Sequence, residues 1–185
     1  VGPMAAVAGT IAEEVCRFVA RTQPNVIVEN GGDIFLSSTE RRVSAIYAGT
    51  SPLSLRVGIA LEPDTFPCAV CASSATVGPS LSLGKAEAAV VVARAGAVAD
   101  ALATALANRI EKLEDLTPAV EWAAAHADVI GALAIMGDTL AAQGKFSRKM
   151  QSMPRSTAPA TFSRRGASTK SYGGFPPAPS RRIVI

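Results

Sequence analysis

Several residue types are scarce in this chain of 185 residues, and each scarcity excludes a class of protein. Three cysteines, Cys16, Cys68 and Cys71, argue against a disulfide-linked scaffold and suit a reducing cytoplasm. With His126 as the single histidine, the Cys68-Ala-Val-Cys71 motif lacks the two further ligands of a zinc site. We therefore expect both motif cysteines to pack in a strand. No apolar run approaches the roughly 20 residues of a membrane helix, so we expect a cytoplasmic protein outside the membrane.

Acidic residues are absent from the last part of the chain. All 15 of them lie at or before Asp138, whereas nine of the 18 basic residues lie at or after Lys145. The net charge of +3 therefore describes the end of the chain and is no evidence for a nucleic-acid-binding fold. Residues 145–185 are rich in Ser, Pro, Arg and Gly without apolar periodicity, so we expect a disordered basic tail. Such a tail could bind anionic partners or simply be solvated.

Residues 1–144 are expected to form one domain in which helical and strand patterns mix without strict βαβ alternation. Glycine-rich Asn30-Gly-Gly-Asp33 is expected to form a turn or a bulge that leads from one strand into the next. This organisation predicts the α+β class, with a mixed or antiparallel sheet packed against helices. The predicted helices are residues 4–22, 94–107 and 118–126, and the predicted strands are residues 25–29, 34–37, 42–48, 55–61, 69–73, 87–93 and, as the last strand, 129–137.

The helix predicted at residues 94–107 is alanine-rich and carries only two polar side chains in its body, Asp100 and Thr104. Residues four apart lie on one helical face, about 6 Å apart along the axis, so a carboxylate and a hydroxyl share a small-residue surface. Oxygen ligands of this kind suit Mg²⁺. The alternative is that Asp100 caps or stabilises the helix N-terminus and that Thr104 bonds back to a carbonyl oxygen.

A loop rich in hydroxyls and glycine follows the strand predicted at residues 69–73. It resembles a phosphate-binding loop, but five residues separate Gly78 from Gly84 and Ala86 follows Lys85, which excludes a standard Walker A motif. Backbone amides, hydroxyls and the Lys85 charge could still hold a phosphate. A simple connecting loop is the alternative.

Five segments, taken in order, resemble a known family. They are Gly2-Pro-Met-Ala-Ala-Val-Ala-Gly9, Glu29-Asn-Gly-Gly-Asp33, Ala48-Gly-Thr-Ser-Pro-Leu53, Cys71-Ala-Ser-Ser74 with Ser80-Leu-Ser-Leu-Gly-Lys85, and Ala99-Asp-Ala-Leu-Ala-Thr104. Residues 1–144 look like uncharacterised protein family 0280, a branch of the ApbE-like superfamily whose characterised members are FAD:protein FMN transferases. Relatives carry a segment ahead of Val1, so we expect this domain to lack its N-terminal segment.

The resemblance implies a site, a cofactor and partners. Asp100 and Thr104 would hold Mg²⁺ at the pyrophosphate of FAD, and FMN would pass to a Ser or Thr hydroxyl of an acceptor protein. A homo-oligomer is a further expectation. The residues expected to line the flavin pocket are Asn30, Gly31, Gly32, Asp33, Ser73, Ser74, Thr76, Ser80 and Lys85.

Two departures from the transferase pattern leave open whether the protein is an enzyme. Pro79 stands in Gly78-Pro79-Ser80 where relatives commonly have Gly-His-Ser, and proline cannot act as an acid or base. Ala8 stands where transferases carry a lysine before the glycine of the first helix. The alternative is a structural or partner-binding domain that kept the fold without the chemistry.

Overall fold

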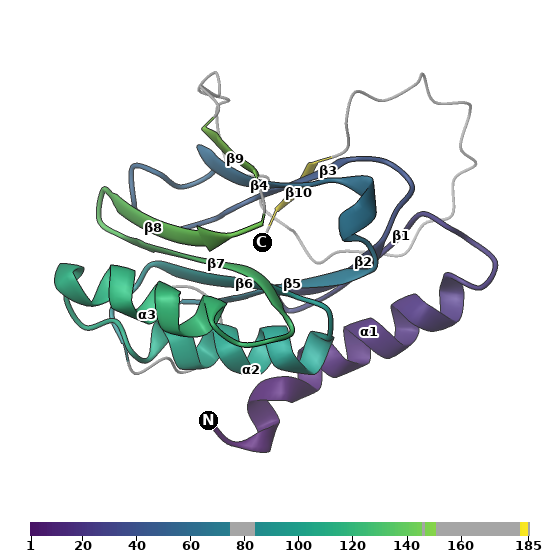
Figure 1. The fold of residues 1–185 in the computed structure, drawn as a ribbon, viewed down its shortest axis with the longest axis horizontal. Helices are drawn as coiled ribbons and strands as arrows, with labels where there is room; N and C mark the ends of the chain where they lie inside the picture. The colour runs from purple at the N-terminus through teal and green to yellow at the C-terminus, as the bar shows by residue number, and fades with distance from the viewer. Residues whose placement is uncertain (75–83, 146, 151–181, 185) are drawn as a thin grey trace, which may run out of the picture.

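The computed structural model describes residues 1–74, 84–145, 147–150 and 182–184, and its helices and strands form three layers (Figure 1). The helices are α1 (Val7–Val19), α2 (Gly96–Ala107) and α3 (Leu116–Ala124), with short 3-10 turns at Pro3–Ala6, Pro63–Thr65 and Leu113–Asp115. The strands are β1 (Val26–Asn30), β2 (Asp33–Ser37), β3 (Arg42–Ala45), β4 (Val57–Leu61), β5 (Cys68–Ser73), β6 (Ala88–Ala93), β7 (Val129–Met136), β8 (Thr139–Gly144), β9 (Ser147–Met150) and β10 (Arg182–Val184). The predicted α+β class is confirmed.

Two sheets form the middle and outer layers. The larger sheet has the strand order β1-β2-β5-β6-β7-β8, and every neighbouring pair in it is antiparallel. The smaller sheet has the order β10-β3-β4-β9, in which β10 runs parallel to β3. Figure 1 shows the three helices on one face of the larger sheet and the smaller sheet over the other face. Both faces of the larger sheet are thus covered.

The two faces of the larger sheet carry separate apolar cores. Along β6, Ala89 and Val91 belong to the core on the helix side, whereas Val90 and Val92 belong to the core between the sheets. On β2, Phe35 likewise belongs to the core on the helix side and Ile34 to the core between the sheets. Successive strand residues point to opposite faces, so a strand covered on both sides reads as a continuous apolar run. That explains why β6 is apolar throughout.

The predicted turn between the first two strands is confirmed. Asn30 pairs with Asp33, and the two residues between them form the hairpin loop. Gly31 and Gly32 have φ values of 67° and 101°. Two-residue hairpin loops favour such positive φ values, which cost glycine least.

The second sheet was only partly anticipated. β3 and β4 are shorter than the predicted strands at residues 42–48 and 55–61. The prediction that residues 129–137 form the last strand was wrong, because β8 continues the larger sheet and β9 pairs with β4. Residues 147–150 and 182–184 of the expected tail therefore pair as strands, and residues 146, 151–181 and 185 lie outside the described residues. A strand that forms only by pairing with a distant segment need not show an alternating apolar pattern in its own sequence. The sequence pattern therefore did not predict these strands.

Membrane-spanning character is not found in the part of the chain that the structure describes. None of its helices combines the length and apolarity needed to cross a bilayer.

Candidate functional site

The candidate site lies where α1, α2 and the β1–β2 turn meet, and a glycine contact sets its geometry. A Cβ atom on Gly9 would overlap the carbonyl oxygen of Gly96 and lie 2.8 Å from Cβ of Asp100. A Cβ on Gly96 would in turn overlap the carbonyl oxygen of Gly9. Glycine at both positions therefore allows the backbones of α1 and α2 to touch. This contact brings the first turn of α1 onto Asp100.

Asp100 lies on α2 and is buried, with 7% of its surface exposed. Its Oδ2 accepts a hydrogen bond of 2.9 Å from the backbone N–H of Gly9, a residue 91 positions away. Asp100 does not cap its own helix, which begins at Gly96. It instead satisfies an N–H in the first turn of α1, which has no partner within that helix. Asp100 thus stabilises a helix N-terminus, as the alternative proposed, but the helix is α1 and not its own helix α2.

The pKa of Asp100 reflects these surroundings. Burial raises this pKa above its ordinary value of 3.8, and hydrogen bonds from the backbone N–H groups of Gly9 and Ala8 work in the opposite direction. Burial disfavours the charged carboxylate, whereas N–H donors stabilise it.

Asp33 is the second buried carboxylate of the site, with 9% of its surface exposed. Burial and then the charge of Asp100 raise the pKa of Asp33 to about 7, against the lowering effect of hydrogen bonds from the Cys71 thiol and the Ala72 N–H. Its Oδ1 atom is buried and has no hydrogen-bond partner among the described residues. Buried polar atoms are seldom left unpaired, so this oxygen is a candidate ligand.

The polar atoms around Asp33 share one face of the sheet. Cys71 is its cross-strand partner on β5 and belongs to the core on the helix side. Ser73 lies two residues beyond Cys71 on the same strand, and alternate strand residues point to the same face. The Ser73 Oγ is likewise buried without a hydrogen-bond partner in the described chain. Two orphaned oxygens, from Asp33 and Ser73, therefore face the helix layer.

Three other predicted pocket residues, Asn30, Gly31 and Gly32, lie in the β1–β2 turn. The Asn30 side-chain amide donates to the carbonyl oxygen of Ala8 at 3.3 Å, which ties the β1–β2 turn to α1. A Cβ on Gly31 or Gly32 would meet nothing within 4 Å, so the turn faces open space. The structure brings this turn together with Asp100.

The loop after β5 is only partly described. The Ser74 hydroxyl donates to the carbonyl oxygen of Glu87 at 2.6 Å. Lys85 donates its backbone N–H to Ile110 beyond the end of α2, whereas Asp100 lies about two turns earlier on that helix. The backbone of Lys85 is therefore not beside Asp100. Thr76 and Ser80 lie outside the described residues, as does Pro79.

Thr104, the other predicted metal ligand, lies one turn after Asp100 on α2 and is partly buried. Among the described residues its hydroxyl has no hydrogen-bond partner, so the alternative of a bond back to a carbonyl oxygen is not seen. The described chain holds no group of three His, Cys, Asp or Glu side chains arranged for a metal ion. A cation at Asp100 would consequently need hydroxyl, carbonyl, water or substrate oxygens as well, as Mg²⁺ commonly uses.

The sequence reasoning missed two residues of the site, Cys71 and Glu13. The prediction that the motif cysteines pack in a strand is confirmed for Cys68 and Cys71, which are buried on β5. Cys71 nevertheless also contacts Asp33, and burial raises the pKa of its thiol well above 9.0. Glu13 accepts a 2.6 Å hydrogen bond from the N–H of Gly96, at the start of α2. Its position one turn after Gly9 was the only available signal.

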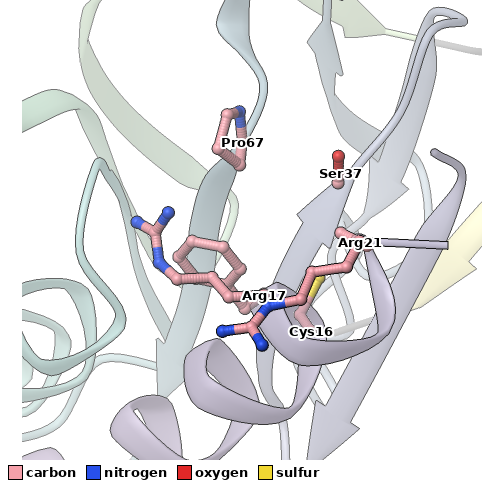
Figure 2. A pocket seen from close by; sticks show the side chains of 7 residues that line it. Cys16, Arg17, Arg21, Ser37 and Pro67 are labelled. Carbon is pink, nitrogen blue, oxygen red and sulfur yellow. The ribbon is translucent and has the colours of Figure 1, made fainter. Parts of the chain in front are cut away.

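A surface pocket of about 310 Å³ lies at the other end of α1. Figure 2 shows Arg17 of α1 and Arg21, two residues beyond the end of that helix, beside the pocket, with Ser37 and Pro67 across from them. Its helical lining begins at Cys16, seven residues and about 10 Å after Gly9. No predicted site residue lines this pocket, so it is separate from the candidate site.

Comparison with known proteins connects the site to a family. A family model described as AbpE bacteria matches residues 1–128. The UPF0280 protein of Methanocella arvoryzae is 44% identical over 149 residues, covering 80% of this chain and 60% of that protein. The UPF0280 protein of Methanosphaerula palustris is 48% identical over 141 residues, covering 74% of this chain and 57% of that protein. The UPF0280 protein of Methanothrix thermoacetophila is 42% identical over 149 residues, covering 78% and 61%.

The chain thus spans about three fifths of the length of these relatives. The matched region contains α1, the β1–β2 turn and α2, which together form the candidate site. The chain belongs to the AbpE bacteria family, as the ApbE-like resemblance of its motifs predicted.

Proposed function

We propose that this protein binds a flavin nucleotide, FAD, together with Mg²⁺ at the junction of α1, α2 and the β1–β2 turn. Asp100 and Thr104 are the proposed cation ligands on α2. The Asn30–Asp33 turn and the segment from Ser73 to Lys85 are proposed to line the nucleotide.

The observation that carries the proposal is the pair of buried carboxylates, Asp33 and Asp100, to which no basic side chain of the described residues bonds. Isolated buried carboxylates are costly, and a divalent cation would offset the cost of this pair. Oxygen donors are also the ligand type that Mg²⁺ prefers. The donor set therefore fits the cation.

Each residue has a definable task in this proposal. The N–H groups of Gly9 and Ala8 orient the Asp100 carboxylate toward the first turn of α1, with Gly9 bonded to Oδ2. Asn30 holds the turn against α1, and Gly31 and Gly32 leave space beside it for a ligand. Mg²⁺ held at such a site would neutralise the pyrophosphate oxygens of the nucleotide.

The proposal stops at binding and does not extend to FMN transfer. Pro79 stands where the family resemblance leads us to expect a histidine, and proline cannot accept a proton from a hydroxyl nucleophile. The second candidate is a structural or partner-binding domain. It is favoured by the hydrogen bond from Gly9 to Asp100, because this bond stabilises the helix pair without any ligand.

Titration calorimetry of the full chain with FAD, in the presence and absence of Mg²⁺, separates the two candidates. The informative variant is Asp100→Asn, which keeps an oxygen to accept the Gly9 N–H but removes the charge. We expect wild-type binding to require Mg²⁺ and to weaken at least about tenfold in this variant. Asp138→Asn, at an exposed position in the β7–β8 turn, is the matched control and should bind like wild type. A folded wild-type protein that binds no FAD with Mg²⁺ present would favour the structural domain.

A further inference from the structure

The side chain of Asp33 has one oxygen that no described residue uses. The Cys71 thiol and the Ala72 N–H both bond to its carboxylate, whereas Oδ1 is buried without a partner. The side chain is nine-tenths buried, so bulk water does not compensate this oxygen. A buried carboxylate oxygen without a donor costs free energy unless a ligand completes it.

Printed contacts connect Asp33 to Asp100 along two routes. On the first, Asn30 pairs with Asp33 across the turn and donates to the carbonyl oxygen of Ala8. The next residue, Gly9, donates its N–H to Asp100. The turn and α2 are thus held to the same turn of α1.

The second route runs through the sheet. Asp33 pairs with Cys71, whose Sγ lies 4.0 Å from the carbonyl oxygen of Gly96. Gly96 lies one helical turn before Asp100 on α2. Both routes place the Asp33 carboxylate under the same stretch of α2 that carries Asp100.

Among the described residues, no Lys or Arg bonds to either carboxylate. Arg17 is the basic residue of α1; it lies in the last turn of that helix, away from the site, and pairs with Glu13 at 2.7 Å. The N–H and thiol donors leave the charge of the pair uncompensated, and paired buried carboxylates are a known arrangement for divalent cations.

We propose that Asp33 is a direct ligand, through its free Oδ1, of the same divalent cation that Asp100 binds. This inference rests on the proposed function for the presence of the cation, and it adds a ligand from the β1–β2 turn to those on α2. A cation held between the turn and α2 joins the sheet to the helix layer before any nucleotide arrives. The site therefore binds the cation on its own, with the nucleotide completing the coordination.

The test is cation binding by the full chain without flavin, using Mn²⁺ as a paramagnetic substitute for Mg²⁺ and following free Mn²⁺ by electron paramagnetic resonance. The variants are Asp33→Asn, Asp100→Asn, the double variant and the exposed control Asp138→Asn. We expect each site variant to weaken Mn²⁺ binding at least tenfold. The double variant should lose little more than either single variant, because both oxygens serve one ion. The control should match wild type.

Circular dichroism confirms that each variant is folded, and Asp33→Ser provides a second substitution should Asp33→Asn fail to fold. If Asp33→Asn binds Mn²⁺ within twofold of wild type while Asp100→Asn loses it, the inference is overturned and the proposed function stands. If wild type binds Mn²⁺ only in the presence of FAD, the same variants are compared with FAD present, and the same outcomes support or overturn the inference. If wild type binds no Mn²⁺ under either condition, both proposals are overturned.

Discussion

Replacing Asp33 by Asn changes how the stability of the metal-free protein depends on pH. Asn has nearly the shape of Asp, so the packing of the β1–β2 turn against α1 is retained. The substitution removes a carboxylate that is nine-tenths buried and faces the charge of Asp100.

The size of the effect follows from linkage between proton binding and folding. Burial, with the charge of Asp100, raises the pKa of Asp33 from 3.8 to about 7 in the folded chain. A difference of about 3 pKa units corresponds to about 4 kcal/mol. Because the folded pKa is the higher one, between pH 4 and 7 the folded chain holds a proton that the unfolded chain has released. The contribution of Asp33 to stability is therefore full below about pH 4, is lost as the pH rises to about 7, and is constant above.

The assay is urea unfolding followed by circular dichroism at several values between pH 4.5 and pH 8, with EDTA present. We expect wild type to lose stability across this range and Asp33→Asn to lose several kcal/mol less. At pH 8 the variant should be the more stable protein, by up to about 4 kcal/mol. Near pH 4.5 the two proteins should differ little.

Two outcomes would refute this reasoning. The first is a variant whose stability falls with pH as steeply as that of wild type. The second is an Asp138→Asn control that flattens the profile as much as Asp33→Asn does, since Asp138 is exposed. Either result would mean that Asp33 is not the buried proton-binding group of the fold.

The remaining predictions concern glycines. Gly9→Ala places a Cβ against the Gly96 carbonyl of α2, so we expect a loss of about 1–3 kcal/mol in urea unfolding, whereas Gly2→Ala, whose Cβ would meet nothing within 4 Å, should change stability little. Gly9→Ala with wild-type stability would contradict the close helix contact. Gly31→Ala meets no atoms but keeps a φ of 67°, so it should cost about 1–2 kcal/mol by strain alone. Its unfolding midpoint in urea checks this, and an unchanged midpoint would show that the turn relaxes.

Some helices and turns could be predicted because the sequence features that specify them lie within a few residues of one another. The Asn30-Gly-Gly-Asp33 segment predicts a two-residue hairpin loop because glycines supply positive φ at little cost, and the structure has it. Alanine-rich residues predict the helix that becomes α2. The same segments supported the family resemblance that the match over residues 1–128 confirms.

The second sheet could not be predicted in full, because its strands depend on distant pairing. β10 joins β3 across a sequence separation of more than 130 residues. Strands of only three or four residues are too short to show a side-chain period, and they depend on backbone hydrogen bonds to a neighbouring strand.

The sequence by itself determined that Asp100 and Thr104 share a helical face and that Asp33 follows a glycine turn, because helical period and turn chemistry are local properties. Only the tertiary structure decided that Asp100 accepts the N–H of Gly9 and that Asp33 is buried beside it. The contact between Gly9 and Gly96 lets two helix backbones touch, and its partners are 87 residues apart along the chain. Burial and charge at the site arise from that approach, so no local pattern could predict them.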